Sequence, residues 1–332
     1  MATATAPATA TPAGVAAGAR RRGAKFRAAP YALLPSLLLT FIFVYGFIAF
    51  SGWISLSRWR RPTRRNLSLR EPFAGTYREL FGEQRFQADM RNMIVFSVGF
   101  LLVAVLGGLV TALLVHHVTV GRGLFRSTFL LPYALSFIVT GVAFRWIFNP
   151  ENGINVVLRK IGIDNPPGWT TDTRVIGTIY GPTDSVHIQL GIPVALIPIV
   201  LAAAWQLMGF AMAMYLAGLA SISSDELEAA SVDGAGTLAR LRYIVIPQLW
   251  PATVTCLVLL LHVALKIFDL VVAMSGSGPG FVTDVPGIYV FDAMTKGNRY
   301  DKGTAAALVV FVITCLVIVP YLARSYRAER SS

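Results

Sequence analysis

Six long apolar segments constrain the fold of this 332-residue chain more than any other feature. A helix needs about 20 apolar residues to cross the roughly 30 Å hydrocarbon core of a bilayer, because its backbone groups must be hydrogen-bonded within the segment. The segments that are long enough are residues 31–56, 93–117, 127–149, 190–219, 251–273 and 303–323. The sequence therefore predicts an all-α fold, a polytopic transmembrane helical bundle of six spans.

The composition also indicates an integral membrane protein in contact with lipid. Charged residues make up only 14% of the chain, against about 25% in soluble domains. The formal net charge is +12, but the basic residues cluster at the ends of apolar segments and do not alternate with exposed aromatic residues, which argues against a nucleic-acid-binding protein. Cys256 and Cys315 lie inside apolar segments, so no disulfide framework or metal-ligand spacing is present.

The N-terminal region combines a polar tail with a long uncharged stretch. Residues 1–19 are almost entirely Ala, Thr, Pro and Gly, which bury too little apolar surface to fold. Basic residues follow from Arg20 to Arg27, and the next apolar region is longer than the ~7–15 residues of a cleavable signal peptide. We expect a disordered basic tail over residues 1–30, followed by an uncleaved signal anchor.

Charge alone does not settle the orientation of the spans. An even number of spans places both termini on one side of the membrane, and the basic cluster before the first span favours the cytoplasm for that side. On this topology the outer loops nevertheless hold more Lys and Arg residues than the inner segments, with a concentration between Arg58 and Arg91. The positive-inside rule is therefore ambiguous for this sequence.

A polar segment interrupts the apolar pattern between the fourth and fifth spans. Residues 228–251 read EAASVDGAGTLARLRYIVIPQLWP. Acidic residues gather just before and inside this segment, at Asp225, Glu226, Glu228 and Asp233. Such a sequence cannot span a membrane and must lie at its surface. Gly234 can adopt the backbone angles that join two helices, and Pro247 and Pro251 restrict how the chain enters the fifth span.

This segment resembles the EAA loop of permease subunits in binding-protein-dependent ATP-binding-cassette (ABC) importers. Residues 126–169 carry a P…W…FN…G…N pattern, and residues 265–280 read LKIFDLVVAMSGSGPG. These two stretches resemble the third span with its outer loop, and the end of the fifth span, in the carbohydrate branch of the family. The resemblance covers about residues 90–325.

The resemblance implies a domain organisation around this loop. A first span and an Arg-rich outer loop would occupy residues 31–92, and the importer core would occupy residues 93–324, with the EAA loop at 226–251. A short cytoplasmic tail would follow over residues 325–332. Because the family loop is cytoplasmic, the resemblance also implies that both termini are cytoplasmic.

The resemblance further implies the partners of the chain. In the family the loop forms two short helices that dock on a separate ATPase subunit. The expected partners are a second homologous permease subunit, a dimer of ABC ATPase subunits, an extracytoplasmic solute-binding protein, a small-molecule sugar and membrane lipid. The positions that match the family loop, and that we expect at the ATPase, are Glu228, Ala229, Ala230, Asp233, Gly234, Ala235 and Pro247.

The chain departs from the family pattern at three places. Leu238 stands where a tryptophan is common, and Leu241 stands where a phenylalanine is common. Both are apolar, so a docking surface of altered shape is expected. The Arg-rich stretch over residues 57–73 has no counterpart in the family pattern.

The sequence carries no nucleotide-binding motif of its own. No GxxxxGK[ST] phosphate loop is present, and the glycine-rich turn at residues 275–280 follows no predicted strand and lacks the Lys-Ser or Lys-Thr ending. No nucleophile–base pair is evident either. We therefore expect a non-catalytic membrane subunit with no cofactor, whose energy comes from ATP and magnesium bound by the partner ATPase.

Ionisable residues near the fifth span are candidates for a substrate path. His262, Lys266 and Asp269 are spaced by four and three residues, which places them on one face of a helix. Either they line an aqueous path for the substrate, or Lys266 and Asp269 form an ion pair within the helix while His262 bonds to a neighbour. Gln206 in the fourth span is either a path residue or an interhelical hydrogen-bonding group.

The predicted function is import of a sugar, an oligosaccharide or α-glucoside, across the inner membrane of a bacterial cell. A polyol or a glycerol phosphate is the alternative substrate. A secondary transporter would show paired intramembrane acids and inverted repeats, whereas only Asp269 qualifies and no repeat is evident. A membrane scaffold or sensor is a third possibility. If the chain is an importer subunit, a bulky residue at position 234 should uncouple transport from ATP hydrolysis; the other two classes do not predict this effect.

Overall fold

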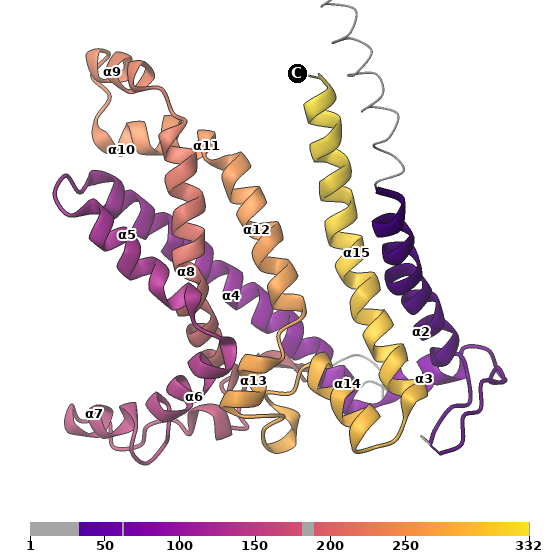
Figure 1. Cartoon of the computed structure of the whole chain (residues 1–332). Helices are drawn as coiled ribbons and strands as arrows, with labels where there is room; N and C mark the ends of the chain where they lie inside the picture. The colour runs from indigo at the N-terminus through magenta and orange to yellow at the C-terminus, as the bar shows by residue number, and fades with distance from the viewer. Residues whose placement is uncertain (1–32, 62, 181–188, 332) are drawn as a thin grey trace, which may run out of the picture. The chain divides into compact units, whose positions relative to one another are not determined.

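The structure is a computed structural model that describes residues 33–61, 63–180 and 189–331 (Figure 1). The chain divides into two compact units, Met1–Trp53 and Ile54–Ser332. The tail predicted over residues 1–30 lies outside the described residues.

The first span is one apolar helix, Leu33–Ser55. It contains the π-helical η1 (Phe41–Gly46) and α2 (Phe47–Ser55). Large apolar side chains are exposed along it, with Phe41 at 69% and Phe47 at 68%. A surface of this kind is stable only in lipid or against another apolar surface. The helix matches the predicted span over residues 31–56.

The second unit is mostly helical. Its longest helices are α4 (Gln84–His117), α8 (Leu196–Ala220), α12 (Trp250–Leu265) and α15 (Tyr300–Ser331). Its shorter helices are α3 (Gly75–Gly82), α5 (Arg122–Leu130), η2 (Leu131–Ala134), α6 (Phe137–Ile147), α7 (Ile154–Lys160), η3 (Trp169–Thr171), α9 (Ser224–Val232), α10 (Thr237–Arg240), η4 (Leu241–Val245), α11 (Ile246–Gln248), α13 (Asp269–Met274), η5 (Pro279–Phe281) and α14 (Pro286–Thr295). Helix α15 continues through the predicted cytoplasmic tail as far as Ser331.

Four helices in the described chain are long and apolar enough to cross a membrane, Leu33–Ser55, Gln84–His117, Leu196–Ala220 and Tyr300–Ala323. Two bent helix pairs also pass the same test together, Arg122–Ala134 with Phe137–Ile147 and Thr237–Gln248 with Trp250–Leu265. The chain therefore makes up to six crossings, if each bent pair is one crossing.

The third predicted span, residues 127–149, is not one continuous helix. Its two arms meet at an angle of 96°. The break lies where Pro132 enters the turn η2 and where Ser136 caps α6, its hydroxyl accepting a hydrogen bond from a backbone amide of the first turn at 3.2 Å. A hydropathy pattern does not report such a bend.

The fifth predicted span, residues 251–273, is also interrupted. Helix α12 ends at Leu265, and α13 begins at Asp269. Between them Phe268 has φ −143° and ψ −62°, outside the helical region. The pair Thr237–Gln248 and Trp250–Leu265 bends by 58° where the chain enters this span.

A small sheet precedes the fourth span, which the all-α prediction did not include. Strands β1 (Val175–Tyr180) and β2 (Gln189–Pro193) pair antiparallel. β-branched residues favour strands, and these strands are too short to stand out from the apolar segment that follows. The predicted start of the fourth span at residue 190 is therefore wrong, because α8 begins at Leu196.

The core of the second unit forms where α4 and α8 pack at close range. A Cβ atom on Gly108 would lie 2.4 Å from the Ala211 Cβ, and one on Gly107 would lie 2.6 Å from the Met208 sulfur. Small residues of this kind allow two membrane helices to approach each other. The large buried side chains of this interface include Phe96, Phe100, Met212 and Tyr215.

Buried charges join the start of α4 to the loop before α14 and to α14 itself. Arg85 donates hydrogen bonds to the carboxylates of Asp284 at 2.6 Å and Asp292 at 2.7 Å. Asn92 donates to the carbonyl oxygen of Asp284 at 2.8 Å. Asp284 is fully buried. This network fixes segments that lie about 200 residues apart in the chain.

Replacing Arg85 by methionine should strongly destabilise the second unit. The buried Asp284 carboxylate would lose its counter-charge, and breaking a buried ion pair in this way costs about 3–5 kcal/mol. Arg174→Met is the matched control, because it removes the ion pair with Asp172 from an arginine whose side chain is 70% exposed. Loss of such an exposed pair should lower the free energy of unfolding by less than about 1 kcal/mol. Thermal unfolding of the two purified variants measures both losses of stability. Equal midpoint temperatures for Arg85→Met and Arg174→Met would contradict the assigned role of Arg85.

Candidate functional site

The polar loop predicted at residues 226–251 forms the connection between α8 and α12, and it begins with α9 (Figure 1). The Ser223 hydroxyl caps this helix by accepting a hydrogen bond from the Asp225 amide at 3.2 Å. Asp225 and Glu226 occupy the first turn, where negative charge interacts favourably with the helix dipole. These two acidic residues therefore stabilise the start of α9.

Gly234 ends α9 in the conformation that its position requires. It has φ +82°, in the left-handed region. Its amide donates to the Ser231 carbonyl at 3.1 Å, and the next amide, of Ala235, donates to the Ala230 carbonyl at 2.9 Å. This is the Schellman pattern of helix termination, which favours glycine. A Cβ at position 234 would meet no atom within 4 Å, so only the backbone angle disfavours a side chain.

Side-chain hydrogen bonds fold the rest of the loop back on α9. Arg240 donates to the Ser231 hydroxyl at 2.8 Å. Gln248 donates to the Glu226 carboxylate. Residues 223–249, the α9–α11 segment, are therefore held together by contacts of their own.

This segment exposes large apolar side chains. Val232 is 87% exposed, Leu238 is 77% exposed and Tyr243 is 73% exposed. Exposed apolar groups on a polar, internally bonded segment are typical of a protein-binding surface. The residues predicted to contact the ATPase share this segment; Ala230 and Ala235 are half-buried in it, and the exposed ones are Glu228, Ala229, Asp233, Gly234 and Pro247.

The family profile named "Binding-protein-dependent transport system inner membrane component" matches residues 104–328. The chain belongs to this family. The match includes the whole α9–α11 segment and the helices on both sides of it.

Similar permease proteins match nearly the full length of the chain. A probable ABC transporter permease protein of Pyrococcus horikoshii is 32% identical, over 90% of this chain and 95% of that protein. The xylose/arabinose import permease protein XacH of Haloferax volcanii is 33% identical, over 91% and 88%. The trehalose/maltose transport system permease protein MalF of Thermococcus litoralis is 28% identical, over 87% and 90%.

Solved structures share the fold. A bacterial ABC transporter involved in the import of the acidic polysaccharide alginate contains a chain that matches with a TM-score of 0.71 and 23% identity. The match covers 93% of this chain and 99% of that chain. Because the likeness extends over nearly the whole length, the two chains share an overall fold.

The three ionisable residues predicted on one helix face do not share a helix. His262 lies in α12, Lys266 caps its end, and Asp269 starts α13. Lys266 Nζ lies 3.0 Å from His262 Nε2. Among the described residues no ion pair joins Lys266 to Asp269. Both the common face and the intrahelical ion pair were therefore wrong, because the helix breaks between the two residues.

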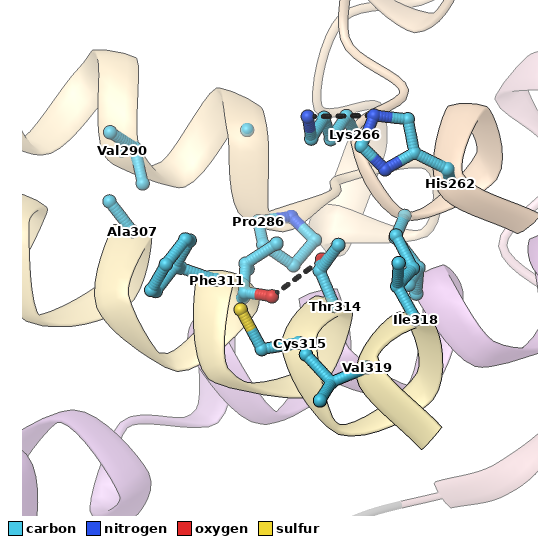
Figure 2. A pocket seen from close by; sticks show the side chains of 13 residues that line it. His262, Lys266, Pro286, Val290, Ala307, Phe311, Thr314, Cys315, Ile318 and Val319 are labelled. Carbon is cyan, nitrogen blue, oxygen red and sulfur yellow. Dashed lines mark hydrogen bonds between the residues drawn. The ribbon is translucent and has the colours of Figure 1, made fainter. Parts of the chain in front are cut away.

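His262 and Lys266 lie at the rim of a cavity of about 470 Å³ between α12, α14 and α15 (Figure 2). Most of the other lining side chains are apolar, Phe311 among them. The Thr314 hydroxyl already donates to a carbonyl of its own helix at 2.8 Å. Recognition of a sugar needs several placed polar groups, so this cavity suits an apolar occupant better than a sugar.

Gln206 stabilises the break in the third span. It is 2% exposed, and its side-chain amide donates to the Leu135 carbonyl oxygen at 2.7 Å. Leu135 lies between η2 and α6, where the helical hydrogen bonds are interrupted. A carbonyl at such a break must find a donor from a neighbouring helix. This geometry supports the interhelical role for Gln206.

Gly209 belongs to the same junction, and it was not among the residues predicted to be functional. A Cβ atom there would lie 1.9 Å from the Phe129 carbonyl oxygen in α5. The only signal in the sequence is a glycine within an apolar segment. Gly99 gives the same signal, yet a Cβ there would meet its nearest neighbours at an ordinary 3.5 Å.

Proposed function

We propose that this chain is the permease subunit of an ABC importer for a sugar and that its α9–α11 segment binds a partner ATPase on the cytoplasmic side. The observation that carries the proposal is the exposure of Val232, Leu238 and Tyr243 on a segment that side-chain hydrogen bonds of its own hold together. Family membership supports the transport role. In this proposal the chain performs no catalysis, and the ATPase binds ATP and magnesium.

The arrangement suits a mechanical connection between the ATPase and the membrane. The α9–α11 segment joins α8 directly to α12, and α8 packs closely on α4. Movement of the docked segment, driven by closure of an ATPase dimer, would therefore be passed to the membrane helices. Together with a second permease chain, these helices would alternate between inward-open and outward-open states.

The substrate class is proposed from the relatives. The names of two of them specify xylose/arabinose and trehalose/maltose, and we propose a sugar for this chain, an oligosaccharide or α-glucoside. A solved relative is in complex with a periplasmic protein that holds an alginate pentasaccharide, and a solute-binding protein would likewise deliver the sugar here. Of the path candidates, Asp269 remains available for cargo, since it is exposed and no described side chain forms an ion pair with it.

Replacing Leu238 by aspartate should weaken binding of the ATPase at least tenfold. The change places a charge on an exposed apolar side chain of the proposed docking surface, where loss of an important contact costs about 2 kcal/mol or more. Val120→Asp is the matched control, because Val120 is 85% exposed outside the segment. The measurement is the amount of ATPase subunit that co-purifies with each variant. Equal recovery for both would contradict the docking role.

Reconstitution tests the proposed function as a whole. The chain, a second permease, the ATPase and the binding protein should together move sugar into vesicles in an ATP-dependent manner. Uptake that requires an ion gradient instead of ATP would identify a secondary transporter. The ligand of the binding protein would distinguish a sugar from a polyol or a glycerol phosphate.

A further inference from the structure

The Arg-rich stretch after the first span forms a two-armed ribbon. Within it, the Arg58 amide donates to the Ser68 carbonyl at 3.0 Å, and the Arg70 amide donates to the Leu56 carbonyl at 2.9 Å. Near the tip the Arg64 amide donates to the Arg61 carbonyl at 3.2 Å. Residues 56–61 and 63–70 are called the arginine ribbon below.

The base of the arginine ribbon is fixed to the start of α15. The Trp59 ring stacks on Tyr300 with 5.0 Å between ring centroids. The Trp59 carbonyl accepts a hydrogen bond from the Asp301 amide at 3.1 Å, and Arg60 lies 3.7 Å from the buried Asp301 carboxylate. Arg70 donates to Glu79 in α3, and this bond lowers the pKa of the Glu79 carboxyl to about 2.

The rest of the arginine ribbon carries uncompensated positive charge. Arg60 and Arg70 have carboxylate partners. The other four arginines are exposed, and in the described chain no carboxylate lies within 4.0 Å of them; they are Arg58, Arg61, Arg64 and Arg65. Like charges on one short segment repel each other. An anionic partner would remove that repulsion.

The position of the arginine ribbon points to a lipid surface. It begins directly after Ser55, where the first membrane helix ends, and it is fixed to Tyr300, where α15 begins. Each arm has about five residues and therefore a reach of about 17 Å, while the headgroup layer of each leaflet is about 5–8 Å thick. Trp59 at the base is a residue type that concentrates at membrane interfaces.

We propose that the arginine ribbon binds the phosphate groups of anionic phospholipids. Guanidinium groups pair well with phosphate, and basic clusters next to membrane helices attract anionic lipid. The side-chain contacts given above attach the ribbon to α3 and to the first residues of α15, not to α8 or α12, which flank the docking segment. A lipid partner fits this peripheral attachment better than a cargo or an acidic protein does. The inference does not depend on the proposed transport function.

The test measures the lipid retained by the full-length chain. The protein is extracted in mild detergent from bilayers of equal parts phosphatidylglycerol and phosphatidylcholine, and bound lipid is quantified by mass spectrometry. The wild-type chain should retain phosphatidylglycerol preferentially. Changing Arg58, Arg61, Arg64 and Arg65 to glutamine should reduce this preference by about fivefold for each arginine that contacts lipid, which corresponds to about 1 kcal/mol per basic residue.

Two further variants make the test specific. Changing the same four arginines to lysine keeps the charge and should retain most of the preference. The control Arg159→Gln with Lys160→Gln removes two exposed charges from α7 and should leave the preference unchanged. An unaltered preference in a well-folded four-glutamine variant would overturn the proposal. It would also be overturned if that variant lost only stimulation by the binding protein, because the ribbon would then be a protein-docking surface.

Discussion

Gly209→Val should abolish accumulation of the folded protein, and Gly209→Ala should destabilise it by about 3 kcal/mol. A Cβ atom at this position would lie 1.9 Å from the Phe129 carbonyl oxygen and 2.8 Å from the Phe129 carbonyl carbon. Both are backbone atoms, so no side-chain rotation relieves the overlap. Separation of α5 from α8 would also disturb the nearby hydrogen bond from Gln206 to Leu135. The measurements are the yield of monodisperse protein in detergent and its thermal midpoint.

Gly99→Ala is the matched control for this prediction. The two glycines lie in the packed pair α4 and α8, but a Cβ on Gly99 would contact only the Val200 side chain, at 3.5 Å. Because alanine favours the helix by up to about 1 kcal/mol over glycine, this variant should be as stable as the wild type or more so. If Gly209→Ala matched it in stability, the close approach of α5 to α8 would be disproved.

Gly234→Arg should leave the chain folded but reduce ATP-dependent uptake by about 100-fold or more. The left-handed backbone at φ +82° costs a non-glycine residue only about 1–2 kcal/mol, and the isolated chain has room for a side chain there. Loss of coupling would therefore come from a changed helix end and from bulk at the docking surface. Uptake into vesicles measures the loss of transport, and co-purification of the ATPase measures the loss of docking.

Two variants separate backbone strain from bulk at this position. Asparagine tolerates the left-handed region, so Gly234→Asn keeps the helix end while adding a side chain. Gly236→Ala is the control, because Gly236 has φ −66° and open space around it. We expect ATP-dependent uptake to be near normal for Gly236→Ala and intermediate, between wild type and Gly234→Arg, for Gly234→Asn. Normal uptake by a stably assembled Gly234→Arg variant would contradict the assignment of the α9–α11 segment to the ATPase.

The helices of the α9–α11 segment were predictable because their signals are local. The cap at Ser223, the acidic first turn and the glycine end of α9 depend on residues within a few positions of each other. The arrangement of the three ionisable residues near the fifth span was harder to predict. The prediction for His262, Lys266 and Asp269 assumed a continuous helix. The backbone angles of Phe268 lie outside the helical region, so Asp269 lies in a separate helix, α13.

Long-range contacts account for the other differences. Nothing near Gln206 in the sequence indicates the carbonyl of Leu135, 71 residues away, that it bonds. The 96° bend that exposes this carbonyl is supported by α8, which supplies both the hydrogen bond and the space at Gly209. The arginine ribbon also depends on a long-range contact. Its excess of positive charge is visible in the sequence, but its attachment to Tyr300 is not.

The sequence by itself determined that this chain is a helical membrane protein with a polar segment between two apolar helices, because hydropathy and helix-end chemistry act over a turn or a single span. Only the tertiary structure decided where two of the spans bend, which glycines are sterically required and which arginines have no carboxylate partner among the described residues. These features arise from contacts between helices far apart in the chain, and such contacts leave no periodic signal in the residues that make them.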